Sequence, residues 1–467
     1  MIQLKGGGFM KQKKSLGFGA RGWVLIFVMF TGMVSFMVFR NYPVNILADF
    51  YGGAAPLGQL LTIGSIIGVV IQIVLSRMFG KIKSVKRLAV IIGIIAIAAA
   101  YGMCLIPIDM SIGQCANLGL WKALFFIVNV AITTYGVFLV SVLAGQWFPR
   151  RKGTVMGIAT IAFPFANGIT GIFANAAMSP LAQGMAPAVF TSFLPFLILA
   201  TVGLIVFIFA LSDYPEQVGA YRDNDKTLTP EVAKAMMEEE IENKRTTVWT
   251  AGHTLTCRDV WFAAVVCGFL LIGSAGVMTQ SNAIVSAFEG LNYTLVMLGV
   301  AVAGAIGSYA IGVLDTAVGT KKAMTFTMCI MVLAGVLGVV AVATGAGAPL
   351  AISFICIALY MGASSNFSVS ISAQYWRRED FPSVFGIINP ISNIFEACGP
   401  SIVIALMATG AGTAILGARS VFIFLMIMGV LGIILMLLFS KKHVKAKDDK
   451  YREAAGKVLD DALADRK

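Results

Sequence analysis

Apolar residues fall in long runs along the chain, separated by short polar segments. Each run is about 20 residues or longer, the length at which an α-helix crosses a hydrocarbon layer about 30 Å thick. Membrane β-strands are shorter and alternate between apolar and polar residues, which these runs do not. The pattern predicts an all-α membrane protein with twelve transmembrane helices, at residues 23–47, 57–76, 88–107, 120–148, 155–178, 188–211, 260–287, 294–314, 322–343, 350–375, 384–408 and 416–439.

The composition indicates a bilayer as the solvent. Hydrophobic residues make up 58% of the 467 residues and charged residues only 12%, with a mean hydropathy of +0.86. A soluble protein of this length needs far more polar surface. Gly and Pro recur inside the runs, as is usual in membrane helices, where neighbouring helices satisfy the backbone groups that these residues leave free.

Lys and Arg lie almost entirely on one side of the predicted helices. If both termini are cytoplasmic, all of the 35 Lys and Arg residues except Arg40, Lys122 and Arg419 fall in cytoplasmic segments. The positive-inside rule therefore predicts a multi-pass protein of the plasma membrane with both ends in the cytoplasm. The net charge of +12 then serves topology and lipid contact, and indicates no nucleic-acid partner.

The sequence gives no support for a signal peptide, a metal site or an enzyme active site. The first apolar run is too long for a signal peptide and lacks a small-residue cleavage site, so it is interpreted as a retained span. The seven Cys show no metal-ligand spacing and are interpreted as apolar fillers, while His253 and His443 lie in a predicted loop and tail. With no HExxH, P-loop or GxSxG motif either, we expect no catalytic residue, no metal, no cofactor and no enzyme.

Two similar stretches stand at matching places in the chain. Residues 146–158 read QWFPRRKGTVMGI and residues 374–387 read QYWRREDFPSVFGI, and six predicted helices separate them. One joins the fourth helix to the fifth, the other the tenth to the eleventh. We therefore predict two related halves. Their limits are residues 1–212 and 259–440, with a cytoplasmic linker at 213–258 and a cytoplasmic tail at 441–467.

The linker and the tail are polar. The linker contains a predicted helix at about residues 230–244, with Thr229 as its N-cap and Pro230 in its first turn. It is interpreted as an amphipathic connection between the halves, with a partner-binding site as the alternative. The tail starts with basic residues and continues as a mixed-charge helix, which we expect to be solvated.

The first repeated stretch resembles the signature between helices four and five of major facilitator superfamily transporters, in particular the organophosphate, anion:cation symporter and oxalate/formate groups. Residues 312–322, GVLDTAVGTKK, are similar to the superfamily loop between helices eight and nine. The counterpart at 76–87 departs from it, since Arg77 stands where the family has Asp. The resemblance implies two pseudo-symmetric six-helix bundles that rock around a central site.

Charged residues in these cytoplasmic loops are candidates for a gate. Ion pairs that exchange partners between two states could hold one state closed and release it in the other. The candidate residues are Arg150, Arg151, Asp315, Arg377 and Arg378. The alternative is that the arginines only set topology, although an acid such as Asp315 in a basic loop has no topogenic use.

Arg40 lies inside a predicted helix, about 17 residues beyond Trp23. A charge at that depth costs several kcal/mol unless it is paired or hydrated, so anion binding is a natural reason for it. The alternative is that its long side chain reaches the outer headgroups. The resemblance favours the first interpretation, because several organic-anion carriers of the superfamily bind a substrate carboxylate or phosphate with an arginine of the first helix.

Glu396 is the one acid predicted well inside a helix. A carboxyl group whose surroundings alternate between water and protein can bind and release a proton near neutral pH, as proton coupling requires. Two alternatives stay open: a structural role, either as an ion pair, possibly with Arg40, or as a hydrogen bond to the backbone near Gly399 and Pro400, and contact with a cationic substrate.

Uncharged polar residues complete the predicted cavity. Asn389, Asn393 and Glu396 recur at spacings of four and three and share one helical face. The other candidates for substrate contact are Tyr42, Tyr135, Gln280, Asn282 and Asn366. Each of them could instead hold neighbouring helices together, but as a set they favour a water-filled cavity.

Together these features predict a secondary active transporter that moves a small organic anion by alternating access, coupled to a proton or a sodium ion. Oxalate is disfavoured because the oxalate carriers use two basic residues, in helices eight and eleven, and residues 294–311 contain none. A single buried Arg favours a monocarboxylate. The alternatives are anion exchange and transport of a neutral or cationic solute that contacts Glu396. A channel and a receptor are the alternative classes of protein. We expect a monomer in the bilayer.

Overall fold

The computed structural model describes residues 17–78, 82, 84–148, 151–225, 227–232, 234–235, 238, 247–377, 380–410 and 413–456. Within these ranges, 12 helical spans are long and apolar enough to cross a membrane. Their bounds are Gly19–Asn45, Ala54–Leu75, Val85–Leu105, Leu118–Trp147, Thr154–Gln183, Val189–Ala210, Arg258–Gly276, Tyr293–Val318, Thr320–Thr344, Gly347–Tyr375, Ser383–Ala408 and Ala414–Leu438. The predicted all-α membrane class with twelve spans is confirmed.

The first six spans form one bundle of helices. Its elements are α1 (Gly19–Asn45), α2 (Ala54–Met78), α3 (Val85–Leu105), α4 (Leu118–Ile132) with η2 (Thr133–Leu139) and α5 (Val140–Trp147), α6 (Lys152–Ala159) with α7 (Ala162–Met178), and α8 (Val189–Ala210). Short elements occupy the connections: η1 (Ala48–Tyr51), the hairpin of β1 (Ile108–Asp109) and β2 (Gln114–Cys115), and η3 (Ser179–Gln183).

The last six spans form the second bundle. Its elements are α11 (Arg258–Leu271) with η6 (Ile272–Gly276), α13 (Tyr293–Val318), α14 (Thr320–Thr344), α15 (Gly347–Tyr375), α16 (Phe381–Ala408) and α17 (Ala414–Leu438). Outside the spans lie η4 (Pro215–Val218), η5 (Arg222–Asn224), α10 (Ala251–Leu255), α12 (Ser281–Ser286) and α18 (Lys441–Ala454). The limits predicted for the two halves and the linker stay predictions.

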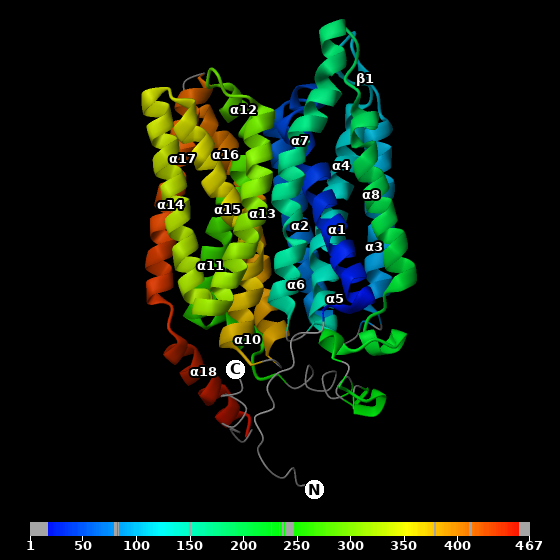
Figure 1. Cartoon of the computed structure of the whole chain (residues 1–467), viewed down its shortest axis with the longest axis vertical. Helices are drawn as coiled ribbons and strands as arrows, with labels where there is room; N and C mark the ends of the chain where they lie inside the picture. Colours follow the sequence, from blue (N-terminus) through cyan, green and yellow to red (C-terminus); the bar gives the residue numbers. More distant parts are fainter. Residues whose placement is uncertain are drawn as a thin grey trace.

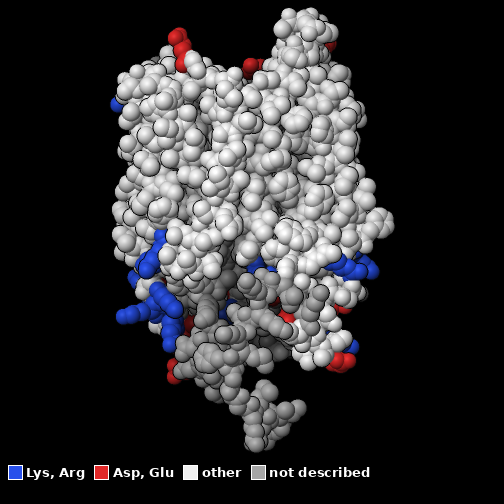
Figure 2. All heavy atoms as spheres, in the orientation of Figure 1, with Lys and Arg blue, Asp and Glu red and all other residues white. Residues whose placement is uncertain are grey.

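The two bundles stand side by side. Figure 1 shows α1 to α8 on the right and α11 to α17 on the left, with the start of α1 and the end of α18 toward the bottom. We call the end with α10 and α18 the basal end, and the opposite end, with β1 and α12, the apical end. Figure 2 shows most of the visible Lys and Arg gathered near the basal end, below a broad band that carries almost no charged atoms. This distribution fits a bilayer around the middle of the molecule.

Two spans change locally from α- to π-helix. One π-helical segment is η2, in the fourth span, and the other is η6, in the seventh. Glycines accompany both: a side chain at Gly136 would meet the backbone of Gly32, and one at Gly276 would meet the backbone of Gly399. These backbones can approach only because small residues face each other, as is common in membrane bundles. Such π-helical segments are frequent at functional sites.

The seventh span is shorter than predicted. The apolar run suggested a continuous helix over residues 260–287, but the helix gives way to a turn at residues 279–280 before α12 begins. The residues at and after the turn, Thr279 to Asn282, are polar, but four polar residues inside a long apolar run do not by themselves indicate that the helix ends there. The break places α12 across the apical end, near α1.

The linker helix is described only in part. Residues 230–232 and 234–235 are helical, and the Thr229 hydroxyl accepts a hydrogen bond from the Val232 N–H at 3.4 Å, as predicted for an N-cap. The rest of the predicted range up to residue 244, Glu238 apart, lies outside the described residues. The tail differs from the expectation of a solvated helix: α18 packs on the basal end, and Val444 and Arg452 are only 2% and 4% exposed. Its apolar and charged residues both find partners on the second bundle, which a local charge pattern does not show.

Candidate functional site

A cavity lies between the two bundles and is lined by both. The first bundle contributes mainly apolar side chains, namely those of Met33, Phe36, Met37, Phe138, Met156 and Phe163. The second bundle contributes most of the polar ones, namely Ser274, Ser364, Ser365, Asn389, Asn393 and Glu396. The two π-helical segments, η2 and η6, both supply lining residues. The cavity therefore has a largely apolar wall from the first bundle and a mixed wall from the second, which carries most of the polar groups.

The cavity extends from the middle of the spans toward the basal end. Its lining includes Ser141 and Met156, near the basal ends of the fourth and fifth spans, and Val369 and Phe385, near those of the tenth and eleventh. Toward the apical end it stops near Glu396. Mid-membrane polar groups are costly unless they serve a pathway or pair with one another, so this arrangement marks a candidate substrate site.

Arg40 and Glu396 meet at this apical limit of the cavity. Arg40 Nη1 lies 3.9 Å from Glu396 Oε1, and their side chains are 5% and 17% exposed. This separation is an ion pair without a direct hydrogen bond. Glu396 lines the cavity while Arg40 lies behind it, so the structure brings together the two charges that the sequence singled out. Arg40 is buried within the protein and does not reach toward headgroups.

The guanidinium of Arg40 is held by groups of the first bundle. Its Nη2 donates a hydrogen bond to Ser65 Oγ at 2.7 Å, and its Cζ lies 3.9 Å from the centre of the Phe36 ring. Ser65 in turn is 3.3 Å from Asn129 Oδ1, so α1, α2 and α4 form one polar network. Among the described residues, Arg40 Nε has no hydrogen-bond partner although it is buried. A buried N–H without a partner points to a ligand that could satisfy it.

The predicted polar face of α16 does line the cavity. Asn389 Oδ1 accepts a hydrogen bond from Ser368 Oγ at 3.1 Å, within the second bundle. Asn393 Nδ2 donates to Gln72 Oε1 at 3.3 Å, across the two bundles. With Glu396, these residues place two amides and one carboxyl group along one side of the cavity.

Three other predicted contact residues lie outside the cavity lining. Asn366 joins the bundles, since its Nδ2 donates to Thr160 Oγ1 at 2.9 Å. Tyr42 is 2% exposed and meets the Phe193 ring edge-on. Tyr135 is also 2% exposed and packs inside the first bundle, away from the cavity. In this conformation, these three side chains therefore do not face the cavity in which a substrate would bind.

Gln280 and Asn282 lie at the apical end and not at the cavity. Gln280 Nε2 donates to the carbonyl of the preceding Thr279 at 2.9 Å. The backbone N–H of Asn282 donates to Asn45 Oδ1 at 3.2 Å. The Nδ2 of Asn45 donates to Ser281 Oγ and to Tyr293 Oη, each at 3.1 Å. Asn45 therefore joins the end of α1 to the second bundle, a role that the sequence analysis missed because an Asn near a helix end carries no distinctive signal.

Two further hydrogen bonds join the two bundles toward the apical end. Thr62 Oγ1 and Ser401 Oγ are 2.8 Å apart, and Asn175 Nδ2 donates to Thr294 Oγ1 at 2.7 Å. A Cβ at Gly168 would collide with Ala301, so α7 and α13 are also in close contact. The bundles are thus joined at the apical end, and the cavity lies on the basal side of this junction.

Two of the candidate gate residues, Arg151 and Arg377, contact segments far from them in the sequence. Arg151 N–H donates to Asp223 Oδ1 at 3.1 Å, and its Nη2 donates to the Gly17 carbonyl, also at 3.1 Å. Arg377 Nε lies 3.2 Å from Asp448 Oδ2 in α18. Asp315 has a buried Oδ1 without a hydrogen-bond partner among the described residues. Arg150 and Arg378 lie outside the described residues, and the gate stays a prediction.

The basal end of the second bundle carries a charge network that the sequence analysis did not anticipate. The buried Asp380, at the start of α16, pairs with Arg452 of α18 and accepts a hydrogen bond from Thr247 Oγ1 at 2.6 Å. Asp448 accepts a hydrogen bond from Trp249 Nε1 at 2.9 Å. The second repeated stretch is therefore held by the tail helix.

Comparisons with known proteins agree with this architecture. The family model described as Major Facilitator Superfamily matches residues 25–400. No curated protein sequence matches the chain. Among solved structures, that of the proton:xylose symporter XylE bound to 6-bromo-6-deoxy-D-glucose is similar, with a TM-score of 0.66 and 14% identity over 91% of this chain and 98% of that one. At this level of identity, the likeness concerns the fold.

Proposed function

The chain belongs to the major facilitator superfamily, whose members are transporters and not enzymes, and we propose that it couples the movement of a small organic anion to that of a proton. As a member it is a multi-pass membrane protein and a secondary transporter of a small molecule. The proposal adds the substrate class, the coupling ion, and a place in the plasma membrane with both termini in the cytoplasm.

The ion pair of Arg40 and Glu396 is the observation that carries the proposal. The two oppositely charged groups lie 3.9 Å apart at the apical limit of the cavity, and each stabilises the charged form of the other. A substrate carboxylate could replace Glu396 as the partner of Arg40 only if Glu396 no longer carried a negative charge that needs a counter-ion. Protonation of Glu396 meets this condition, because a neutral carboxyl group leaves Arg40 without an ionic partner.

This exchange of partners couples one proton to one monoanion. In the first state, ionised Glu396 pairs with Arg40. In the second, Glu396 carries a proton and the substrate carboxylate pairs with Arg40, also through the unpartnered Nε. An unpaired charge inside the protein costs several kcal/mol, so states with only the proton or only the anion are disfavoured. The proton and the anion would therefore be bound and released together.

The cavity walls support a monocarboxylate with an apolar body. The wall of Met33, Phe36 and Phe163 offers apolar contact, while Asn389 and Asn393 face it. A sugar, the substrate named for XylE, needs hydrogen bonds around its whole ring. A neutral solute is nevertheless the second candidate, since Glu396 reaches the cavity directly and Arg40 does not.

The apical junction supports alternating access. With the bundles joined at the apical end and the cavity on the basal side, the conformation corresponds to a carrier closed on one side of the membrane. If the termini are cytoplasmic, the state faces the cytoplasm.

Reconstitution into proteoliposomes tests the proposal. A panel of labelled monocarboxylates, dicarboxylates, sugars and amines is offered while a pH gradient is imposed and the membrane potential is clamped. We expect accumulation of a monocarboxylate that collapses when the gradient is dissipated. Accumulation of neutral solutes alone would overturn the substrate class, and accumulation driven only by a sodium gradient would overturn the coupling ion. Anion exchange that never becomes uphill transport would make the protein an antiporter.

A further inference from the structure

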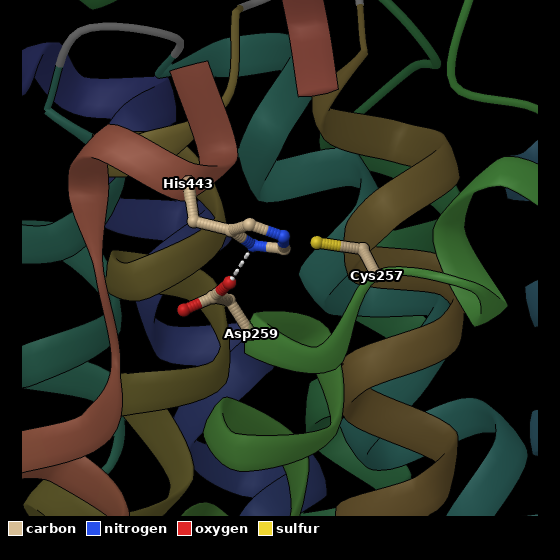
Figure 3. A group of neighbouring side chains, drawn as sticks. All are labelled: Cys257, Asp259 and His443. Atoms are coloured by element: carbon tan, nitrogen blue, oxygen red, sulfur yellow. Dashed lines mark hydrogen bonds and ion pairs between the residues drawn. The ribbon is translucent and has the colours of Figure 1, made fainter. Parts of the chain in front are cut away.

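Cys257, Asp259 and His443 come together at the basal end, away from the central cavity (Figure 3). Cys257 directly precedes α11, Asp259 lies in its first turn, and His443 lies in the first turn of α18. One potential ligand atom from each residue lies within 4.8 Å of the other two. Cys257 and Asp259 are fully buried, and the His443 side chain is 31% exposed. The chain thus brings a thiol, a carboxylate and an imidazole together over a long sequence separation.

Asp259 fixes the orientation of the imidazole. Its Oδ2 accepts the hydrogen bond of His443 Nδ1, and its Oδ1 accepts one from the Ser440 N–H at 2.7 Å. With Nδ1 engaged, the second ring nitrogen is the one available for a ligand, and Figure 3 shows it turned toward the sulfur of Cys257. A carboxylate that holds one imidazole nitrogen while the other binds metal is the usual outer arrangement of metal-bound histidines.

We propose that Cys257 Sγ and His443 Nε2 bind a divalent cation of the zinc class, with Asp259 as the carboxylate that orients the histidine. Thiolate and imidazole are the donors that zinc prefers. Two such donors on one zinc ion lie about 3.5 Å apart, and the potential ligand atoms here lie within 4.8 Å of one another, so a movement of the partly exposed His443 could complete the site. Water would supply the remaining ligands.

A reactive thiol is the other use of a cysteine beside an aspartate–histidine pair, and the environment disfavours it. The Cys257 side chain is fully buried, which denies access to a substrate. A metal ion displaces the proton and needs no route for a larger molecule.

The ion would join the tail helix to the transmembrane body. The other end of α18 is already anchored by the Arg452–Asp380 pair, and the metal would fix its first turn to α11. No metal was predicted because metal ligands are recognised in a sequence by their close spacing, whereas Cys257 and His443 are 186 positions apart. The proposal is independent of the substrate and coupling proposed above.

Cobalt binding to the purified full chain tests the site. Co²⁺ bound by a thiolate gives a charge-transfer absorption band in the near ultraviolet, which reports the sulfur ligand directly and does not depend on transport. We expect the band to saturate at one Co²⁺ per chain and to disappear when Zn²⁺ is added. Absence of the band in folded wild-type protein at saturating Co²⁺ would overturn the proposal.

Matched variants identify the ligands. Cys257→Ser should abolish the band and His443→Gln should weaken Co²⁺ binding at least tenfold. The controls are Cys329→Ser, at an exposed cysteine of α14, and His253→Gln, at the other histidine; both should leave the titration unchanged. Retention of the band in Cys257→Ser, or its loss in the Cys329 control, assigns the sulfur elsewhere and contradicts the proposal. Hydrogen exchange of α18 should slow on addition of Zn²⁺ and recover with a chelator, and unchanged exchange in the metal-bound protein would refute the joining role.

Discussion

Arg40 and Glu396 face each other across the two bundles, with Nη1 of the arginine 3.9 Å from Oε1 of the glutamate. The arginine belongs to the first span and the glutamate to the eleventh, so their pairing depends on how the two halves meet. Glu396 also lines the cavity, whereas Arg40 is reached only past it. Because the two groups pair, a change in the charge of one alters the stability of the charge on the other. Two predictions follow from this dependence.

Replacing Arg40 with Ala should abolish uptake of the anionic substrate, at least a hundredfold below wild type. The substitution removes the cation that binds the carboxylate and leaves Glu396 without its partner. Arg40→Lys should recover little, because an ammonium group cannot reproduce the contacts of Nη1 and Nη2 together. Initial uptake rates in proteoliposomes measure the effect. Arg419→Ala, at an exposed arginine of α17, is the control and should transport normally. Near-normal uptake by Arg40→Ala would remove the anion site from this position.

Replacing Glu396 with Gln should separate exchange from accumulation. The amide resembles a permanently protonated carboxyl group, so substrate can still bind Arg40, but no proton is carried. We expect exchange of labelled for unlabelled substrate within about threefold of wild type and no uphill uptake in an imposed pH gradient. Glu289→Gln, at an exposed acid between α12 and α13, should retain both activities. If Glu396→Gln still accumulates substrate, the proton is carried by another group.

Removal of the Asn45 side chain should open the apical end. In Asn45→Ala the hydrogen bonds to Ser281, Tyr293 and the Asn282 N–H are lost. Each contributes about 1 kcal/mol, so the equilibrium between closed and open states should shift about tenfold or more. Hydrogen exchange of η1 and α12 should accelerate accordingly.

The control for this experiment is Asn41→Ala, one helical turn earlier. Among the described residues, the one hydrogen-bond partner of Asn41 Nδ2 is Met37 Sδ of the same helix, at 3.7 Å, so its loss should leave apical exchange unchanged. Equal acceleration in both variants would show that α1 is generally destabilised, and no acceleration in Asn45→Ala would show that the other apical contacts suffice.

Replacing Arg452 with Ala should release the tail helix. The change removes the arginine that pairs with the buried Asp380, and breaking a buried ion pair from one side costs about 3–5 kcal/mol. We expect a lower Tm and faster proteolysis within α18. The double variant Asp380→Asn, Arg452→Gln should be less destabilised than Arg452→Ala, because it leaves no buried charge at position 380, and Asp448, the other partner of Arg452, keeps its ion pair with Arg377. Lys450→Ala, at an exposed position of α18, should behave like wild type.

The spans were predictable because membrane insertion depends on a local property. A run of about 20 apolar residues must be helical in lipid, whatever surrounds it. The predicted tenth and eleventh spans, 350–375 and 384–408, lie within a few residues of the observed Gly347–Tyr375 and Ser383–Ala408. The repeated arginine-containing stretches likewise indicated two halves, since they repeat along the chain and need no contact to be recognised.

The partners of the site residues were not predictable in the same way. The sequence left Glu396 with three interpretations and did not identify Ser65 as a contact of Arg40 or Asn45 as an apical link. It also placed Tyr135 at the cavity, whereas in the structure this side chain packs within the first bundle. A run of hydrophobic residues sets a helix but does not set which way that helix is rotated, so the side chains that face one another depend on packing between spans.

By itself the sequence determined that this chain spans a membrane twelve times and carries two unusual buried charges, because both facts follow from the cost of polar groups in lipid. Only the tertiary structure decided that those charges pair, that most polar groups of the cavity come from the second bundle, and that Cys257 lies near His443. Each of these depends on residues far apart in the chain reaching the same place, and that is fixed by how the helices pack.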